Sequence, residues 1–310
     1  MLARSLKRLN RNKMLLLMVL PATIWFVVFS YLPMAGTIIA FKEYRYDSGG
    51  FLASIVNSQW VGMKNFDFLF RTDDAFIITR NTVLYNAAFI VLGLIVAVAM
   101  AIVLVELSSK RLSKTYQTAM FMPYFLSWVI VGYFVFSFLS SSKGLLNQIT
   151  SLFGMEPINW YADPKYWPYI LVLIYLWKFV GYNSVMYLAA IMGIDRSLYE
   201  AAMIDGAGKW KQIRHITLPQ LSALMTILTL LAVGKIFYAD FGLFYQVPRD
   251  SGLLYATTNV IDTYVYRGLK TTGEIGMTTA AGLYQSFVGF VLVVSTNFIV
   301  RKINKDNALF

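Results

Sequence analysis

Apolar residues along the chain fall into six long runs separated by shorter polar segments. A helix needs about 20 mostly apolar residues to cross the roughly 30 Å hydrocarbon core of a bilayer. Each run meets that length, so the pattern predicts an all-α polytopic membrane protein with six transmembrane helices and one transmembrane domain over residues 1–310. The predicted spans cover residues 14–41, 84–105, 116–139, 168–192, 216–238 and 278–300.

The first run is long and contains Pro21 and Pro33, which predict a kink or a tilt. A basic stretch, MLARSLKRLNRNK, precedes it, as in a secretory signal peptide. The apolar core of a signal peptide is only about 7–15 residues long. The length of this run therefore favours a transmembrane helix.

Composition supports the membrane class, because 58% of the 310 residues are hydrophobic and 14% are charged. Soluble domains carry about 25% charged residues. The chain has no cysteine and only one histidine, His215. Disulfides, thiolate catalysis and metal sites built from cysteines or several histidines are therefore excluded, and we expect no metal and no catalytic residue.

The formal net charge of +11 is distributed unevenly over the loops. Residues 1–13, 106–115, 193–215 and 301–310 together hold 15 basic and 5 acidic residues. The opposite loops, 42–83, 140–167 and 239–277, hold 10 basic and 11 acidic residues. The positive-inside rule then predicts that both termini are cytoplasmic. Because topology explains the excess charge, we expect no nucleic-acid partner.

Aromatic residues in the opposite loops are typical of membrane-interface anchors. A role of some of them in docking a partner is the alternative. These residues are Trp60, Trp160, Tyr161, Tyr166 and Trp167.

One cytoplasmic segment, EAAMIDGAGKWKQIRHITLP at residues 200–219, contains Gly206-Ala207-Gly208-Lys209. A phosphate loop of the Walker type requires G-x-x-x-x-G-K-[ST]. Met203 stands where that pattern needs its first glycine, and Trp210 stands where it needs a hydroxyl. The segment therefore does not bind a nucleotide.

The same segment reads locally as two short helices with a break between them. Ser197 and Glu200 have the S-x-x-E spacing of a capping box, which predicts the start of the first helix. Gly206-Ala207-Gly208 ends that helix, and a basic stretch begins the second. An amphipathic element of this kind either lies on anionic lipid headgroups or inserts into the groove of a partner protein. Local physics leaves both possibilities open.

A family resemblance favours the partner protein. Glu200-Ala201-Ala202, Gly206, Ile216 and Leu218-Pro219 match the EAA motif of ABC-importer permeases without a gap. The stretches WVGMKNF, MPYFLSW and EIGMTTAAGLYQSFVGF also resemble sugar permeases of that superfamily, most closely the branch for oligosaccharides and polysaccharide fragments. The resemblance implies that residues 197–219, here called the EAA segment, contact a separate ATPase. The implied contact residues are Glu200, Ala201, Ala202, Asp205, Gly206, Ile216, Leu218 and Pro219.

The resemblance also implies the function and the partners. The chain would be the permease subunit of an ATP-driven importer for an oligosaccharide or polysaccharide fragment in the bacterial inner membrane. It would form half of the translocation path beside a homologous second permease. ATP and Mg²⁺ would bind a dimeric cytoplasmic ATPase, this chain would hold no cofactor, and an extracytoplasmic solute-binding protein would deliver the sugar. The chain lacks the extra N-terminal helices and the large outer domain of maltodextrin-type permeases, so their substrate is not transferred to it.

Polar and aromatic residues in the spans are candidates for the substrate path, because sugars bind aromatic faces and hydroxyl-satisfying polar groups. The candidates are Tyr175, Lys178, Tyr182, Asn183, Tyr187, Tyr238 and Gln285. For Lys178 we favour a packing role, in which the ammonium pairs with a backbone carbonyl or with an acid of another subunit. Core packing is likewise the commoner role of such tyrosines.

Two other classes of protein explain the sequence less well. A secondary transporter driven by an ion gradient is the main alternative, but it should carry acids within its spans. All sixteen acids fall in the predicted loops. A membrane-embedded enzyme needs clustered acids with a metal or a nucleophile and a base. Neither class accounts for the EAA spacing.

Overall fold

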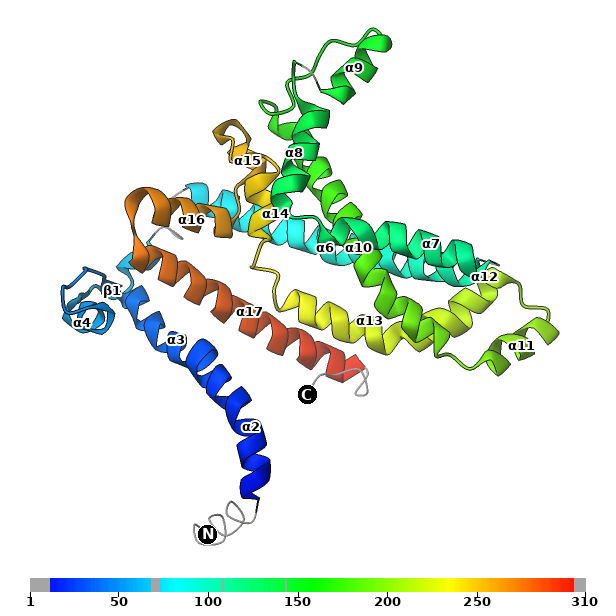
Figure 1. The fold of residues 1–310 in the computed structure, drawn as a ribbon, viewed down its shortest axis with the longest axis horizontal. Coiled ribbons are helices and arrows are strands. Elements are labelled where there is room, and N and C mark those ends of the chain that lie inside the picture. Colours follow the sequence, from blue (N-terminus) through cyan, green and yellow to red (C-terminus); the bar gives the residue numbers. More distant parts are fainter. Residues whose placement is uncertain (1–11, 68–72, 108, 143, 304–310) are drawn as a thin grey trace. The chain divides into compact units, whose positions relative to one another are not determined.

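The computed structural model describes residues 12–67, 73–107, 109–142 and 144–303 (Figure 1). The terminal segments 1–11 and 304–310, which support part of the predicted orientation, lie outside the described residues. The chain divides into two compact units. One comprises Met1–Phe70 and Gly268–Leu283, and the other comprises Arg71–Arg267 and Tyr284–Phe310.

The first unit begins with the predicted first span. Residues 13–41 are helical throughout and pass through an α-helix, a π-helical turn and a 3₁₀ end, and Pro21 does not interrupt them. A small hairpin follows, in which Asn65 Nδ2 donates to the carbonyls of Ala40 and Lys42 at 3.0 and 2.9 Å. The elements are α2 Lys13–Phe26, η1 Val27–Tyr31, α3 Leu32–Met34, η2 Ala35–Phe41, β1 Lys42–Glu43, α4 Phe51–Asn57, β2 Gln59–Trp60, antiparallel to β1, and η3 Lys64–Phe66.

The second unit is built around two long helices, α6 and α10, which pack along each other with α7 and α13 beside them (Figure 1). Its helices begin with α6 Asp73–Glu106, α7 Lys110–Phe121, η4 Met122–Phe125, α8 Trp128–Leu139, α9 Leu145–Leu152, η5 Pro164–Tyr166 and α10 Trp167–Met192. They continue with α11 Arg196–Ile204, α12 Lys209–Gln212, η6 Ile213–Thr217, α13 Leu218–Val233, α14 Phe241–Gln246, η7 Gly252–Leu254 and α15 Tyr255–Thr258. Helices α16 Ile261–Thr272 and α17 Ile275–Ile303 contribute residues to both units.

Five helices of the described residues are long and apolar enough to cross a membrane, and a bent pair makes up to six. The predicted spans 14–41, 84–105, 168–192 and 278–300 each lie within one helical stretch. The predicted third span, 116–139, is not one straight helix. Its two halves, Arg111–Phe125 and Trp128–Leu139, meet at an angle of 100°.

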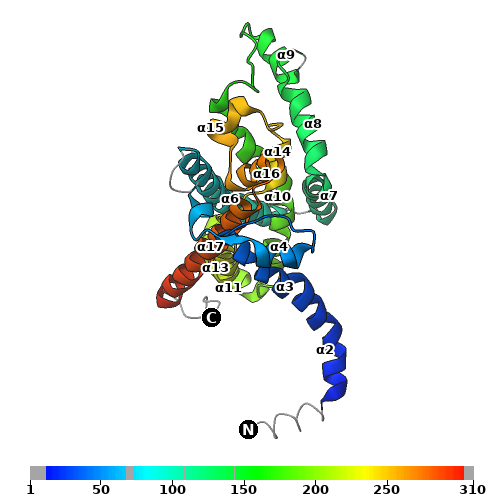
Figure 2. The same ribbon diagram turned by 90° about the vertical axis from the view of Figure 1, so that its left-hand side faces the viewer.

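The bend in the third span has a local cause. Pro123 has no backbone N–H and therefore cannot extend the hydrogen-bond ladder of α7. Ser127 begins a new helix, since its Oγ accepts from Ile130 N at 3.3 Å. Helix α8 consequently leads away from α7 toward α9, as both views of the ribbon show (Figures 1 and 2).

The predicted fifth span, 216–238, extends too far at its C-terminal end. Helix α13 ends at Val233, and residues 234–240, here called the unwound segment, form turns and irregular backbone. Gly234 lies directly against α17, where a Cβ atom would come 2.4 Å from Val293 Cγ2. The apolar run continues past Val233, so composition alone did not show where the helix ends.

Two buried cores lie along α6 and α10. One is formed by Tyr85 and Phe89 of α6 with residues of α8, α10, α14 and the segment that follows α14: Val131, Val135, Leu139, Trp167, Leu171, Leu243, Phe244, Val247, Leu254 and Val260. The other joins α6 and α10 to the start of α13 through Ala97, Val98, Ala101, Leu104, Tyr187, Leu188, Ile191 and Leu221.

The interface-anchor prediction is wrong for part of the aromatic set. Trp167 is fully buried, and its Nε1 donates to the Trp160 carbonyl at 2.6 Å. Tyr161 OH donates to the Val247 carbonyl at 3.2 Å. Trp167, at the start of α10, is part of the first core, and the Tyr161 ring packs against that core. Trp60 of the first unit is exposed.

Candidate functional site

Helix α11 opens the EAA segment and is capped by a residue that the sequence reading missed. Asp195 Oδ1 accepts from Ser197 N at 2.9 Å, so Asp195 is the N-cap. The predicted capping box of Ser197 and Glu200 is therefore wrong by two residues. The hydrogen bond from Ser197 N lowers the pKa of the Asp195 carboxyl below its ordinary value, because it favours the ionised form.

The end of α11 follows the prediction. Gly206 has φ +75°, the left-handed conformation that glycine adopts without a steric cost. Ala207 N donates to the Ala202 carbonyl at 2.8 Å, and Gly206 N donates to the Met203 carbonyl at 3.1 Å. This pair of bonds is the Schellman arrangement, which satisfies carbonyls that the helix end would leave free.

Side chains then close the EAA segment into a hairpin. Gln212 is buried, and its Nε2 donates to the Ala207 carbonyl at 2.9 Å. The hydroxyls of Tyr199 and Thr217 are 2.9 Å apart and join α11 to the start of α13. Leu218 packs against the second core. These contacts link α11 to the start of α13.

The tip of this hairpin is exposed. Glu200, Ala201, Asp205 and Gly206 are all exposed, while Ala202, Ile216 and Leu218 are half-buried. Large apolar side chains stand beside the acid, with Ile204 87% exposed. An exposed face of small and apolar residues with two carboxylates is suited to a groove in another protein.

A concave surface of about 440 Å³ lies beside the hairpin. Lys209 Nζ forms an ion pair with Glu106 Oε2, at the end of α6, at 2.8 Å. Both side chains are substantially exposed, so the pair contributes about 0.2–1 kcal/mol. Glu106, Tyr199, Glu200 and Lys209 all line this surface, which connects the EAA segment with α6.

A second hollow, here called the central cavity, lies between α6, α10 and α13 and measures about 270 Å³. Three predicted path residues line it together: Tyr175, Asn183 and Tyr187. The Tyr175 ring stacks on Phe89 with centroids 3.8 Å apart. Phe89 belongs to one core and Tyr187 to the other, so the cavity separates the two cores. Its other lining residues are Ile90, Gly93, Leu94, Met186, Leu228, Thr229 and Ala232.

Lys178 and Tyr182 lie on a different face of α10. The Lys178 ammonium donates to the carbonyls of Pro123, at 3.2 Å, Tyr124, at 3.0 Å, and Leu126. Lys178 thus satisfies the backbone where α7 breaks from α8, which is the carbonyl pairing favoured from the sequence. Tyr182 stacks on Tyr124 with centroids 4.2 Å apart.

Tyr238 belongs to the unwound segment, and Gln285 belongs to α17, which contacts this segment. The Tyr238 hydroxyl lies 2.7 Å from Ser286 Oγ of α17. Gln285 is buried, and its Nε2 donates to the Phe237 carbonyl at 2.7 Å and to Asp262 Oδ2 at 3.2 Å. The seven path candidates therefore occupy three places: the central cavity, the α7–α8 break and the unwound segment.

Further residues around the unwound segment were not singled out for this role from the sequence. Asn86 of α6 donates to the carbonyls of Ile236 and Tyr238 at 2.9 and 3.2 Å. Asp262 Oδ2 accepts from Ala239 N at 2.8 Å, and Asp240 Oδ2 accepts from Trp128 Nε1 at 3.0 Å. The polar Asn86 within an apolar run was the available signal, since backbone groups that leave a helix must find other partners when they are buried.

Burial raises the pKa of both Asp240 and Asp262 above the ordinary value of 3.8. For Asp240, hydrogen bonds from Leu243 N and Trp128 act in the opposite direction. For Asp262, hydrogen bonds from Ala239 N and Gln285 do the same, and the nearby Asp240 adds to the increase. Both acids hold backbone and side-chain donors in place, and neither belongs to a helix that qualifies as a span.

The second unit thus has an exposed hairpin, a cavity between long helices and a bend in the predicted third span, and comparisons with known proteins identify its family. The sequence profile of the family described as "Binding-protein-dependent transport system inner membrane component" matches residues 89–305. The chain belongs to this family. It is thus a multi-pass inner-membrane permease component of an ABC importer and not the ATPase, which binds the ATP. Membership decides against the ion-coupled transporter.

Individual members of the family are similar over nearly the whole chain. The polygalacturonan/rhamnogalacturonan transport system permease protein YteP of Bacillus subtilis (strain 168) is 34% identical over 303 residues, 98% of this chain and 92% of that protein. A chain in the crystal structure of a bacterial ABC transporter involved in the import of the acidic polysaccharide alginate has a TM-score of 0.86 at 32% identity, covering 97% of this chain and 99% of that chain. A structure of such a transporter with an alginate pentasaccharide-bound periplasmic protein gives the same TM-score.

Proposed function

We propose that this permease forms one half of the path by which an ABC importer takes up an oligosaccharide or polysaccharide fragment. Its partners are a homologous second permease, a dimeric cytoplasmic ATPase and an extracytoplasmic solute-binding protein, and both of its termini are cytoplasmic. The relatives named for polygalacturonan, rhamnogalacturonan and alginate support this substrate class. The basic loops that include the EAA segment support the orientation.

The exposed hairpin of the EAA segment carries the proposal. Glu200 stands at its surface as the acid that contacts a basic residue of the ATPase, and Ala201 and Ala202 allow the two proteins to approach closely. Gly206 makes the turn that the Schellman bonds require. Ile216, Leu218 and Pro219 lie where the hairpin passes into α13.

The same geometry suggests how ATP binding reaches the path. Closure of the ATPase dimer displaces α11, and the Tyr199–Thr217 contact transmits the displacement to α13. Helix α13 lines the central cavity through Leu228, Thr229 and Ala232. Its motion therefore changes the wall of the cavity and shifts the permease from inward-facing to outward-facing.

The central cavity is the proposed sugar path within this subunit. The phenol groups of Tyr175 and Tyr187 and the amide of Asn183 provide donors and acceptors for sugar hydroxyls. The Tyr175 ring is already stacked on Phe89, so it offers its hydroxyl and its edge to a sugar. Lys178 and Gln285 hold neighbouring backbone carbonyls, and Tyr182 and Tyr238 contact the side chains of Tyr124 and Ser286.

Co-expression with the partner permease, the ATPase and the solute-binding protein tests the coupling proposal. The complex is purified in nanodiscs, and both co-purification and the ATPase rate stimulated by loaded binding protein are measured. Glu200→Lys and Gly206→Pro are compared with wild type. Glu156→Lys is the matched control, because it makes the same change at an exposed acid of the opposite loop.

We expect the Glu200 and Gly206 variants to assemble poorly or to hydrolyse ATP without stimulation, and the Glu156 variant to behave as wild type. Equal behaviour of all four proteins contradicts the coupling role of the EAA segment.

A further inference from the structure

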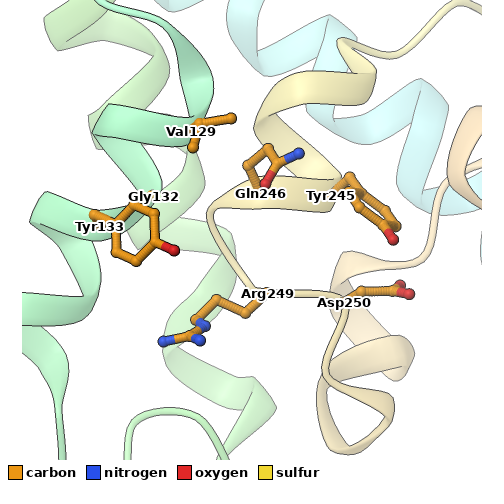
Figure 3. Close-up of a pocket in the computed structure, with 7 residues that line it drawn as sticks. All are labelled: Val129, Gly132, Tyr133, Tyr245, Gln246, Arg249 and Asp250. Atoms are coloured by element: carbon orange, nitrogen blue, oxygen red, sulfur yellow. The ribbon is translucent and has the colours of Figure 1, made fainter.

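A cavity of about 240 Å³ lies between α8 and α14 and is distinct from the central cavity. Val129, Gly132 and Tyr133 of α8 form one wall (Figure 3). Tyr245 and Gln246 of α14, with Arg249 and Asp250 beyond it, form the other. We call this hollow the α8–α14 cavity.

Arg249 contributes a positive charge to this cavity that no acid neutralises among the described residues. Its guanidinium lies over the Phe136 ring, 4.1 Å from the centroid. The neighbouring Asp250 is already paired, because its Oδ1 lies 2.7 Å from Arg267 Nη1 and 3.2 Å from Tyr255 OH. Figure 3 shows the Arg249 side chain directed toward the α8 wall and Asp250 directed away from it.

The backbone holds these two charges apart in an unusual conformation. Arg249 and Asp250 have φ values of 57° and 48°, and they are the only non-glycine residues with positive φ in the described part of the chain. Such a conformation is strained for a residue with a side chain and persists only where its surroundings impose it, and such residues cluster at binding sites. The Asp250–Arg267 pair anchors the turn and leaves Arg249 free to face the cavity.

The walls offer the other groups that a sugar requires. Tyr133 is 64% exposed, so its ring and hydroxyl are accessible. Tyr245 is fixed by stacking on Phe241 at 4.9 Å. Gly132 brings α8 within close range of α14, where a Cβ atom would lie 2.7 Å from the Gln246 carbonyl. Guanidinium, phenol and amide groups around one small hollow suit a sugar unit that carries a carboxylate, which arginine binds with two parallel hydrogen bonds.

We propose that the α8–α14 cavity binds a carboxylate-bearing sugar unit of the transported oligosaccharide, with Arg249 as the carboxylate ligand. This inference rests on the proposed function of the chain as an oligosaccharide permease. The cavity is smaller than the roughly 300–1,000 Å³ of sites for drug-sized ligands, so it takes a single sugar unit.

The position of the cavity in the chain fits an entry site. Helix α13 starts at the EAA segment, and α14 follows its opposite end. Helix α7 starts near Glu106, which is paired with Lys209 of the EAA segment, and α8 follows the far end of α7. Helices α8 and α14, which form the two walls of the cavity, therefore both follow helices whose other ends lie at the EAA segment.

The test uses the assembled transporter and two probes, trigalacturonate and its carboxyl-reduced, neutral counterpart. Binding to the ATP-trapped complex and uptake into proteoliposomes are measured for wild type, Arg249→Gln and Arg249→Lys. Lys165→Gln is the matched control, since it removes an exposed positive charge that lies outside the cavity.

Wild type should bind and transport trigalacturonate. Arg249→Gln should weaken trigalacturonate binding about tenfold to a hundredfold, because it removes a charge-assisted hydrogen bond. Arg249→Lys should weaken trigalacturonate binding less than Arg249→Gln does, because lysine keeps the charge but loses the two parallel hydrogen bonds. Lys165→Gln should match wild type, and binding of the neutral trisaccharide should be the same in all variants.

Unchanged trigalacturonate binding by Arg249→Gln overturns the inference and leaves the proposed function intact. An equal loss for the charged and neutral sugars also overturns it, because Arg249 would then act only by packing on Phe136. A wild-type complex that neither binds nor transports any oligosaccharide overturns the proposed function together with the inference.

Discussion

Replacing Lys178 with methionine should destabilise the permease strongly, although this residue lies away from the EAA segment. Lysine has three N–H donors, and Lys178 directs them at the three carbonyls of Pro123, Tyr124 and Leu126. Methionine is similar in length and has no donor. The Lys178→Met variant therefore leaves three carbonyls at the α7–α8 break without their partner.

The expected magnitude follows from these bonds. A hydrogen bond to a charged group contributes about 1.5–3 kcal/mol, so three would contribute more than about 4 kcal/mol before any offset. Each buried carbonyl left without a partner costs about 1–3 kcal/mol, and removing the buried ammonium recovers part of its desolvation cost. We expect a loss of about 3–5 kcal/mol, or roughly 6–20 °C in apparent Tm.

Thermal unfolding of the detergent-purified complex, followed by size-exclusion chromatography with fluorescence detection, measures this loss. Lys235→Met is the matched control. Lys235 is an exposed lysine of the unwound segment whose ammonium has no partner among the described residues. The control should change the free energy of unfolding by only a few tenths of a kcal/mol, and its apparent Tm should therefore stay close to that of wild type. Equal shifts for the two variants refute the reasoning.

Two further predictions concern close packing and buried charge. Gly181→Ala places a Cβ atom 1.9 Å from the Met120 carbonyl and should lower the free energy of unfolding by about 1–3 kcal/mol, which appears as a lower apparent Tm. Gly93→Ala meets no atom within 4 Å and should raise the apparent Tm slightly. A loss of the same size in both variants contradicts this packing. Because burial raises the folded-state pKa of Asp262 above 3.8, its contribution to stability is present below pH 3.8 and is lost as the pH rises through the raised value. Asparagine at position 262 stays neutral and keeps an acceptor oxygen, so the apparent Tm of Asp262→Asn should vary less between pH 4 and 7 than that of wild type. Part of the pH dependence remains, because the pKa of Asp240 is also raised. An unchanged dependence of Tm on pH contradicts the raised pKa of Asp262.

The helices that carry long uninterrupted apolar runs could be predicted well from the sequence. Helix α10 was predicted to within one residue, because its apolar run coincides with the helix itself. The turn at Gly206 was also predicted, since a glycine directly after an amphipathic stretch is a strong stop signal. The resemblance to EAA permeases depended on seven positions at fixed spacing, and the family match confirms it.

The breaks in the apolar runs could not be predicted in the same way. The bend after Pro123 and the end of α13 at Val233 both occur inside continuous apolar sequence. Each break is stable only because distant residues satisfy its backbone, such as Lys178 at the first and Asn86 at the second. These partners lie more than 50 residues away along the chain, so no local pattern reveals them.

The path candidates show the same limit. Tyr175, Lys178 and Tyr182 are all path candidates of one helix, but the structure directs Tyr175 to α6 and the other two to the α7–α8 break. The helical spacing of these residues does not distinguish between the two neighbours. Which neighbour each side chain meets depends on how α6 and α7 pack around α10.

Cross-linking from the tip of α11 tests the central claim most directly. The chain has no cysteine, so Ala201→Cys introduces a unique thiol on the exposed hairpin, and Ser151→Cys places one on exposed α9 as the control. We predict that the thiol at position 201 cross-links to the ATPase, that the yield changes when ATP binds, and that an impermeant reagent added outside intact cells labels only the thiol at position 151. External labelling at position 201, with no cross-link to the ATPase, contradicts the claim that the EAA segment couples this permease to ATP.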